Sequence, residues 1–354
     1  MILKWILLTC YKHLNGERTT SSIFHLLKGK RSIQTVQDAH IYKLDQYYGI
    51  HKRIKKVDID AVTQELLRAG YIQHHAVNES SFIITGPGIE WLEKHTIDIF
   101  FKGLMYYEKS DVFLDRLLLL IQTLTNSKEN NFSFIPIVEN PKVEFWVKQI
   151  YRKVKGKEAS FLRNLYNELH IILNQFPDKE AEIFVDRLTA YKNFGLSLFQ
   201  LAEKHQITED DAHLVHTSSI HRILEKVEND SIEFPVLSLF LKGLSNEMMS
   251  QITISAKETY QLLQSGYTIE QIAFTRRLRE NTINDHIVEI ALYLDDFPIW
   301  NYVKEQEQTE ILQAINQAKS HKLKEIKSRV SEHINYFQIR LVLAMQARLQ
   351  KQGD

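Results

Sequence analysis

Seven basic side chains gather in two short stretches near the start of the chain. They are Lys28, Lys30, Arg31, Lys52, Arg53, Lys55 and Lys56. Cationic side chains in segments that join helices can neutralise phosphates, which hold a nucleic acid without reading its sequence. Residues 1–96 carry thirteen Lys and Arg against nine Asp and Glu, whereas the whole 354-residue chain has a net charge of zero. A nucleic-acid site therefore has to come from local clustering of this kind.

A second candidate site begins at Ser255 and has the pattern of a helix-turn-helix. Ser255 with Glu258, and Thr268 with Gln271, have the spacing of a capping box, so a helix is predicted to begin at each pair. Gly266 suits the left-handed residue that ends a helix. The sequence therefore predicts two short helices here, with a third to follow.

The third helix of this unit would present short polar side chains to a nucleic acid. Its buried stripe is predicted to be Ile283, Ile287, Ile290 and Ala291, and its outward face Asn281, Thr282, Asn284, Asp285 and His286. Side chains of this kind reach base edges and phosphates when a recognition helix lies in the major groove. The candidate contacts are Thr268, Arg276, Arg277, Asn281, Thr282, Asn284 and His286. A three-helix packing unit that touches no nucleic acid is the alternative.

The turn before this third helix departs from the usual pattern. Such turns often place Gly before the apolar residue, because the backbone there has positive φ. Here Arg277 precedes Leu278. Either the turn tolerates the strain, or Arg277 holds a guanidinium where a phosphate passes.

Catalysis and cofactor binding are not expected. A nucleotide-binding loop needs G-x-x-x-x-G-K-[ST], and the Gly-Lys pairs are Gly29-Lys30 and Gly156-Lys157. Phe24 and Tyr151 stand where the first glycine should be. We therefore expect no enzyme activity, no cofactor and no small-molecule substrate.

Metal binding is not expected either. Asp210, His213 and His216 could share one face of a helix, but a solvated helix end is the simpler interpretation. Cys10 is the single cysteine, which excludes internal disulfides and a multi-cysteine zinc site. The apolar start of the chain is short and interrupted by Lys4, so we interpret it as a core helix. No run of about 20 apolar residues could span a membrane, and we expect a cytoplasmic, nucleoid-associated protein.

The coarse fold follows from helical periodicity and one hairpin pattern. Residues 1–96 read as three main helices, the third capped by Asp58 or Asp60, and then a hairpin whose turn is Asn78–Ser81. That is the order of a winged helix. The predicted fold is mainly α, with a winged-helix domain at 1–96, a helical middle domain at 97–250 and a helix-turn-helix domain at 251–350.

The N-terminal region resembles the RQC winged-helix domain of RecQ-type DNA helicases. The resemblance rests on HLLKGKRS at residues 25–32, on K-L-x-x-Y-x-G-I at residues 43–50 and on L-L-x-x-G-Y at residues 66–71. It implies contact with duplex DNA at an unwinding junction, with the hairpin at the fork. The four-cysteine zinc module that precedes this domain in many RecQ helicases is absent from the sequence.

The C-terminal region resembles the helix-turn-helix domain found at the end of some RecQ helicases, including the tail YFQIRLVLA at residues 336–344. The two domains without a motor between them resemble YpbB-like bacterial proteins encoded beside RecQ-type helicase genes. This implies a non-enzymatic accessory that binds duplex or fork DNA and acts with a RecQ-type helicase in repair or recombination. The alternatives are a sequence-specific transcription regulator with two DNA-binding heads and a scaffold that binds proteins.

Overall fold

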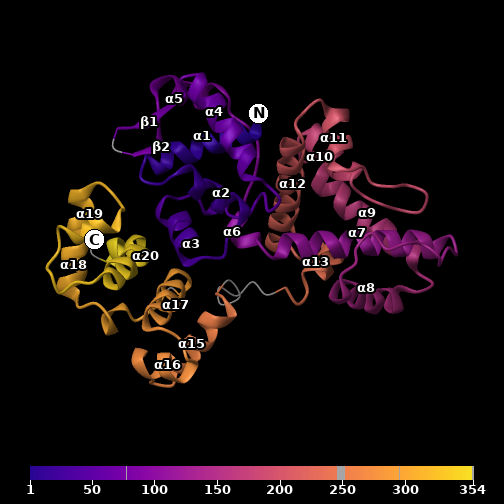
Figure 1. Cartoon of the computed structure of the whole chain (residues 1–354). Coiled ribbons are helices and arrows are strands. Elements are labelled where there is room, and N and C mark those ends of the chain that lie inside the picture. The colour runs from indigo at the N-terminus through magenta and orange to yellow at the C-terminus, as the bar shows by residue number, and fades with distance from the viewer. Residues whose placement is uncertain (77, 245–251, 295, 353–354) are drawn as a thin grey trace.

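The computed structural model describes residues 1–76, 78–244, 252–294 and 296–352, and for residues 79, 347–348 and 350–352 the backbone alone. The fold is mainly α-helical with one small antiparallel hairpin, as the sequence predicts (Figure 1). The domain boundary expected at residues 250 and 251 lies outside the described residues.

The N-terminal part has the connectivity of a winged helix. Its elements are α1 (Ile2–Leu14), α2 (Thr20–Lys28), α3 (Ile33–Ile41), η1 (Asp45–Tyr47), α4 (Lys56–Arg68), β1 (Ile72–His75), β2 (Asn78–Ile84) and α5 (Gly86–Lys94). Thr19 forms a single antiparallel bridge with Ser81, so the segment between α1 and α2 lies beside β2. Helices α1 and α2 both pack on α4, and α3 is an additional helix inserted between α2 and α4 in the sequence.

Two local predictions for this part are wrong. The residues expected to form the hairpin turn, Asn78–Ser81, belong to β2, because the ladder continues through a bulge until His75 pairs with Asn78. Neither Asp58 nor Asp60 is the N-cap of α4. Lys55 occupies that position, and Asp58 instead accepts a hydrogen bond from the backbone N–H of Lys55 at 3.0 Å.

The middle part is a stack of helices without strands among its described residues. It contains α6 (Gly103–Tyr106), α7 (Lys109–Lys128), α8 (Pro141–Val154), α9 (Glu158–Leu173), α10 (Asp178–Asp186), α11 (Leu198–His205), α12 (Glu209–Asn229) and α13 (Pro235–Leu241). Helices α8 and α9 both lie on α7, and α12 lies between α7 and α1 (Figure 1). This arrangement brings α12 against α1 of the N-terminal part.

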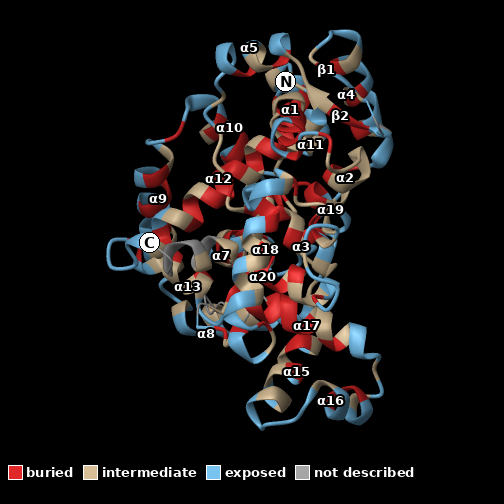
Figure 2. Ribbon diagram, turned by 90° about the vertical axis from the view of Figure 1, so that its left-hand side faces the viewer, coloured by how far each residue is buried: buried red, intermediate tan, exposed pale blue. Residues whose placement is uncertain are grey.

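The C-terminal part consists of a helix-turn-helix followed by three more helices. Its elements are α15 (Ile254–Gln264), α16 (Ile269–Arg276), α17 (Glu280–Tyr293), η2 (Ile299–Asn301), α18 (Glu305–Ala318), α19 (Leu323–Lys327) and α20 (Tyr336–Gln352). Helix α17 is central, because α15, α16 and α20 all pack against it. Figure 2 shows α17 mostly buried and α16 largely exposed.

The inserted helix α3 joins the two ends of the chain. It contacts both α17 and α20, and its residues Ile33, Val36 and Ile41 pack against the C-terminal core. The side-chain Nε2 of Gln37 donates to the backbone oxygen of Arg340 at 2.9 Å. The N-terminal winged helix is therefore docked directly on the C-terminal helix-turn-helix. None of the helices described is both long and apolar enough to cross a membrane.

Candidate nucleic-acid interface

Three of the predicted lysines form an exposed basic patch on the N-terminal domain. Lys28 ends α2, Lys30 follows it and Lys56 begins α4, and all three are exposed. His25 lies among them. Its pKa is lowered by partial burial and then by the positive charges of Lys30, Lys28 and Lys56. The three ammonium groups thus act on one place, as a phosphate-binding surface requires. We call Lys28, Lys30 and Lys56 the basic patch.

Arg31 and Lys52 belong to the same predicted cluster, but their charges are paired with carboxylates of this chain. Both cations lie against the ring of Tyr107, at 5.5 Å for Arg31 and 4.3 Å for Lys52. Arg31 pairs with Glu108, and Lys52 pairs with Asp111 at 2.6 Å. Their charges are matched by carboxylates of the middle part, so they hold the two parts together.

Two glycines make this contact possible. Gly29 and Gly49 have φ values of 71° and 68°, and a Cβ on either would lie within 2.4 Å of the Tyr107 ring. The hydroxyl of Tyr107 donates to the backbone oxygen of Gly29 at 2.9 Å. Gly29 therefore does more than end α2, because it also leaves room for the aromatic ring.

Arg53 and Lys55, the other two predicted cations, are also exposed. Arg53 is close enough to Arg187 and His213 to help lower their pKa values, after burial as the larger cause. It therefore faces α12 and its neighbours. Lys55 is the N-cap of α4, and its ammonium has no salt bridge among the described residues.

The outward face of α4 carries both signs of charge. Asp60, Gln64, Glu65 and Arg68 are exposed along it. Carboxylates on this face would repel a phosphate backbone. Only the start of α4, with Lys56, is suited to DNA, and the basic patch lies at that end.

The start of the helix-turn-helix differs from the prediction. Thr268 caps α16 and exchanges hydrogen bonds with Gln271, as the capping box predicts. Ser255 and Glu258 form no such box, because α15 begins one residue before Ser255 and is capped by Thr253.

Ser255 and Glu258 instead bind Arg276. The guanidinium of Arg276 donates to the backbone oxygen of Ser255 at 2.6 Å and to Glu258 Oε2 at 2.7 Å. It also donates to Thr259 Oγ1. Arg276 therefore clamps α16 to α15, and its charge is already paired.

The polar face predicted for α17 is only partly exposed. Asn281 is exposed and Thr282 is half-buried. Asp285 pairs with Arg340 on α20, and His286 is buried with its Nδ1 2.8 Å from Thr259 Oγ1. Burial, followed by the charge of Arg276, lowers the pKa of His286. The prediction that His286 faces outwards is wrong, because it is buried against Thr259 of α15. Asp285 keeps 41% of its side chain exposed, although it is paired with Arg340. The Oδ1 atom of Asn284 is also buried and has no hydrogen-bond partner among the described residues.

The turn between α16 and α17 has the geometry predicted from its sequence. Arg277 is in the left-handed region, with φ 55° and ψ 40°, and its side chain is exposed. A surface hollow beside it is lined by Phe274, Leu278, Arg279 and Asn281, among others. Phe274 is 87% exposed. The sequence analysis missed this ring, although an aromatic residue next to the buried pair Ile272 and Ala273 could have indicated it.

The three residues weighed as metal ligands serve to pack α12. His51 Nε2 is 2.8 Å from Asp210 Oδ1, and the ring of His51 lies 4.4 Å from that of His213. Burial lowers the pKa values of His213 and His216 to about 3. Both histidines are therefore neutral, His213 in the contact between the N-terminal domain and α12, and His216 in the contact between α12 and Phe184 of α10.

Comparison with known proteins agrees with this organisation. Residues 4–102 match the RQC domain, and residues 255–343 match a family described as a helix-turn-helix domain. Both are DNA-binding rather than catalytic domains. No solved structure gives a significant match. Protein YpbB of Bacillus subtilis (strain 168) is 29% identical over 350 residues, which cover 97% of this chain and 97% of the relative. The chain is therefore similar to YpbB over nearly its whole length, with an RQC domain at its start and a helix-turn-helix domain near its end.

Proposed function

We propose that this protein is a non-enzymatic accessory that binds duplex or fork DNA and acts with a RecQ-type helicase in DNA repair or recombination. The observation that carries the DNA part of the proposal is the basic patch, because its three lysines are exposed and close enough to act together on His25. Phosphate contacts of this kind bind DNA of any sequence. The helicase part rests on the resemblance to RQC domains in a chain that carries no nucleotide-binding loop.

The proposal includes a division into domains at 1–96, 97–250 and 251–350, with nucleoid association following from DNA binding. Among the candidate residues of the C-terminal domain, Thr268, Arg277 and Asn281 are exposed and Thr282 and Asn284 are half-buried, whereas Arg276 and His286 are held by internal hydrogen bonds. On α17 the accessible candidates are confined to residues near its start. This favours an accessory over a regulator that reads DNA with two heads, because reading base edges needs several side chains of one helix in the groove.

DNA binding is tested by neutralising the basic patch. The variant K28Q/K30Q/K56Q should bind forked and plain duplexes more weakly, and the slope of log affinity against log salt should fall by up to about 3, at roughly 0.9 per phosphate contact. R31Q/K52Q is the control from the same predicted cluster, and it should leave the salt slope unchanged. Equal losses of DNA affinity in both variants would show that the basic patch contributes no more to DNA binding than Arg31 and Lys52 do.

The partnership is tested separately. The protein is isolated from its own cells with nuclease present, and purified protein is added to strand-separation assays of the RecQ-type helicase from the same organism. An accessory should be recovered with the helicase and stimulate it on forks. Preference for one duplex sequence by on the order of 10³ would indicate a regulator. Recovery with the helicase but no affinity for DNA would indicate a scaffold.

A further inference from the structure

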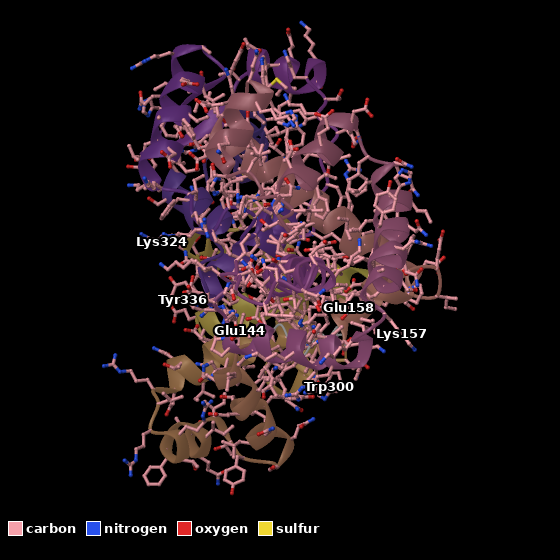
Figure 3. The ribbon with its side chains drawn as sticks, turned by 90° about the vertical axis from the view of Figure 1, so that its right-hand side faces the viewer. Glu144, Lys157, Glu158, Trp300, Lys324 and Tyr336 are labelled. Atoms are coloured by element: carbon pink, nitrogen blue, oxygen red, sulfur yellow. The ribbon has the colours of Figure 1, made fainter. Side chains whose placement is uncertain are left out.

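The consecutive helices α8 and α9 carry a dense group of cations in the middle of the chain. Lys148, Arg152, Lys153, Lys155, Lys157 and Arg163 are all exposed. Figure 3 shows Lys157 and Glu158 at the turn between the two helices and Glu144 towards the other end of α8. These cations lie on helices that pack on α7, away from the basic patch of the N-terminal domain (Figure 1).

Each carboxylate on α8 and α9 has a hydrogen-bond or salt-bridge partner, whereas most of the cations on these helices have none among the described residues. Glu168 is buried and accepts from the backbone N–H groups of Val236 and Leu237, at 2.9 and 2.8 Å. Glu158 lies at the first turn of α9 and accepts from Ser127 Oγ at 3.3 Å. Glu144 pairs with Lys148 at 3.7 Å. The carboxylates of α8 and α9 are thus bound to partners other than the cations considered next.

Five cations remain without a salt bridge or a side-chain hydrogen bond to any residue that the structure describes. They are Arg152, Lys153, Lys155, Lys157 and Arg163. Another lysine-rich segment, around α19, behaves differently. There Lys322 pairs with Glu325, and Lys327 donates to two backbone oxygens. These five α8–α9 cations therefore form a dense group with no salt bridge among the described residues, although the charge of Lys155 contributes to lowering the pKa of Glu158.

Exposed aromatic side chains share the outward faces of these two helices with the cations. On α8, Phe145, Lys148 and Arg152 are spaced by three and four residues, which places them along one face. On α9, Arg163 is followed at the same spacing by Tyr166. Phe145 and Tyr166 are each 63% exposed. Exposed rings among cations are typical of proteins that bind single strands, because unpaired bases stack on the rings while the cations follow the phosphates.

We infer that the outward faces of α8 and α9 form a binding surface for single-stranded nucleic acid. The cations contact its phosphates, and Phe145 and Tyr166 stack against unpaired bases. This surface lies outside both matched domains and gives the middle part a role of its own. An anionic membrane would also attract the cations, but it would not use the two rings in stacking.

The surface is tested with the full chain and a labelled oligothymidylate of about 20 nucleotides, a length that spans a typical binding site. K153Q/K155Q/K157Q should weaken binding by on the order of 10- to 100-fold near 0.1 M salt, and should lower the salt slope by up to about 2. The matched control K94Q/K319Q/K324Q removes the same charge from exposed lysines elsewhere. Equal loss in the control would overturn the inference.

The rings provide the second measurement. F145A and Y166A should each weaken binding by about 5- to 100-fold. F199A removes a comparably exposed ring from α11 and should change nothing. Unchanged affinity in both ring variants would overturn the assignment to single strands, as would tighter binding to vesicles of anionic phospholipid than to the oligonucleotide. The basic patch is intact in all these variants, so loss of duplex binding in K28Q/K30Q/K56Q and loss of single-strand binding here are independent results.

Discussion

The two helices that hold the position of a recognition helix, α4 and α17, have opposite surroundings. Helix α4 turns one face to solvent, with Lys56, Asp60, Gln64 and Arg68 exposed along it. Helix α17 is enclosed by α15, α16, α20 and α3, and its residues from His286 to Tyr293 are all buried. A helix-turn-helix pattern therefore identifies the packing of three helices. It does not establish that the third helix can enter a groove.

The polar side chains of α17 have become part of an intramolecular contact. Arg340 joins Asp285 on α17 to Gln37 on α3, whose Oε1 accepts from Arg340 Nε at 3.3 Å. Glu289 is buried and accepts from the backbone N–H of Thr253 at 2.6 Å. Buried polar groups need such partners, because leaving one unpaired costs about 1–3 kcal/mol. The same groups that suit base edges thus suit an internal network.

The largest effect should be the response to acid of the buried histidines on α12, the helix that packs against α1 of the N-terminal part. Burial lowers the pKa values of His213, His216 and His221 on α12 to about 3. The folded state keeps them neutral while the unfolded state takes up protons near pH 6.5, so stability is lost as pH falls from about 6.5 towards 3. At pH 5 each histidine should cost about 2 kcal/mol.

Thermal melting between pH 7.5 and 5 checks this acid response. His216 stacks on Phe184, with ring centroids 6.0 Å apart, so H216F should keep the packing and reduce the pH dependence by about one proton. H170F alters an exposed histidine and should not change the pH dependence. If the free energy of unfolding of H216F depends on pH as strongly as that of the unchanged protein, His216 does not contribute to the acid response.

Displacing α3 should expose the covered part of α17. Val36 on α3 packs against both the N-terminal and the C-terminal core, so V36E would place a charge at the joint and cost roughly 2–4 kcal/mol. Amide exchange in α17 should become faster, as read by mass spectrometry of peptides from that helix. Q34E changes an exposed residue of the same helix and should leave exchange unaltered. Unchanged exchange in V36E would show that α3 does not protect α17.

The DNA affinity of the same V36E protein tests whether α17 can bind DNA. If the covered face of α17 is able to bind DNA, duplex affinity should rise when α3 is displaced. Affinity equal to that of Q34E would mean that α17 serves packing alone.

Neighbouring arginines in the turn should differ in the sign of their effect. Arg276 is bound by Ser255, Thr259 and Glu258, so R276A should lower the free energy of unfolding by about 2 kcal/mol. Melting of R276A against R277G measures the difference, because only glycine removes the Cβ from the left-handed position. A variant R276A that melts normally but binds DNA more weakly would restore Arg276 as a DNA contact.

The smallest effect is expected at Arg277. R277G relieves a left-handed side chain, worth about 1–2 kcal/mol, but adds freedom to the unfolded chain worth roughly 0.4–1 kcal/mol. A net gain below about 1 kcal/mol should follow. K319G, at φ 49° after α18, is the matched control and should behave alike. A fall of about one in the salt slope for R277G alone would place its guanidinium on a phosphate.

Local structure that depends on a few neighbouring residues could be predicted from the sequence, because its physical cause lies within those residues. Thr268 and Gln271 close a capping box, Gly266 has φ 84°, and Arg277 is left-handed, as their spacing indicated. The order of helices and hairpin also identified the winged helix. Local predictions failed where a competing local arrangement was available, as at Ser255, where Thr253 caps the helix instead.

What only the tertiary structure decided is which polar side chains remain free. Arg31 finds Glu108, His51 finds Asp210 and Asp285 finds Arg340, each across a long separation in sequence. Charge and helical periodicity give a residue's chemical type and its face, but its partner depends on how distant helices pack. For that reason the sequence by itself determined the two DNA-binding domains, while the docking of α3 on α17 decided that their third helices differ in access to DNA.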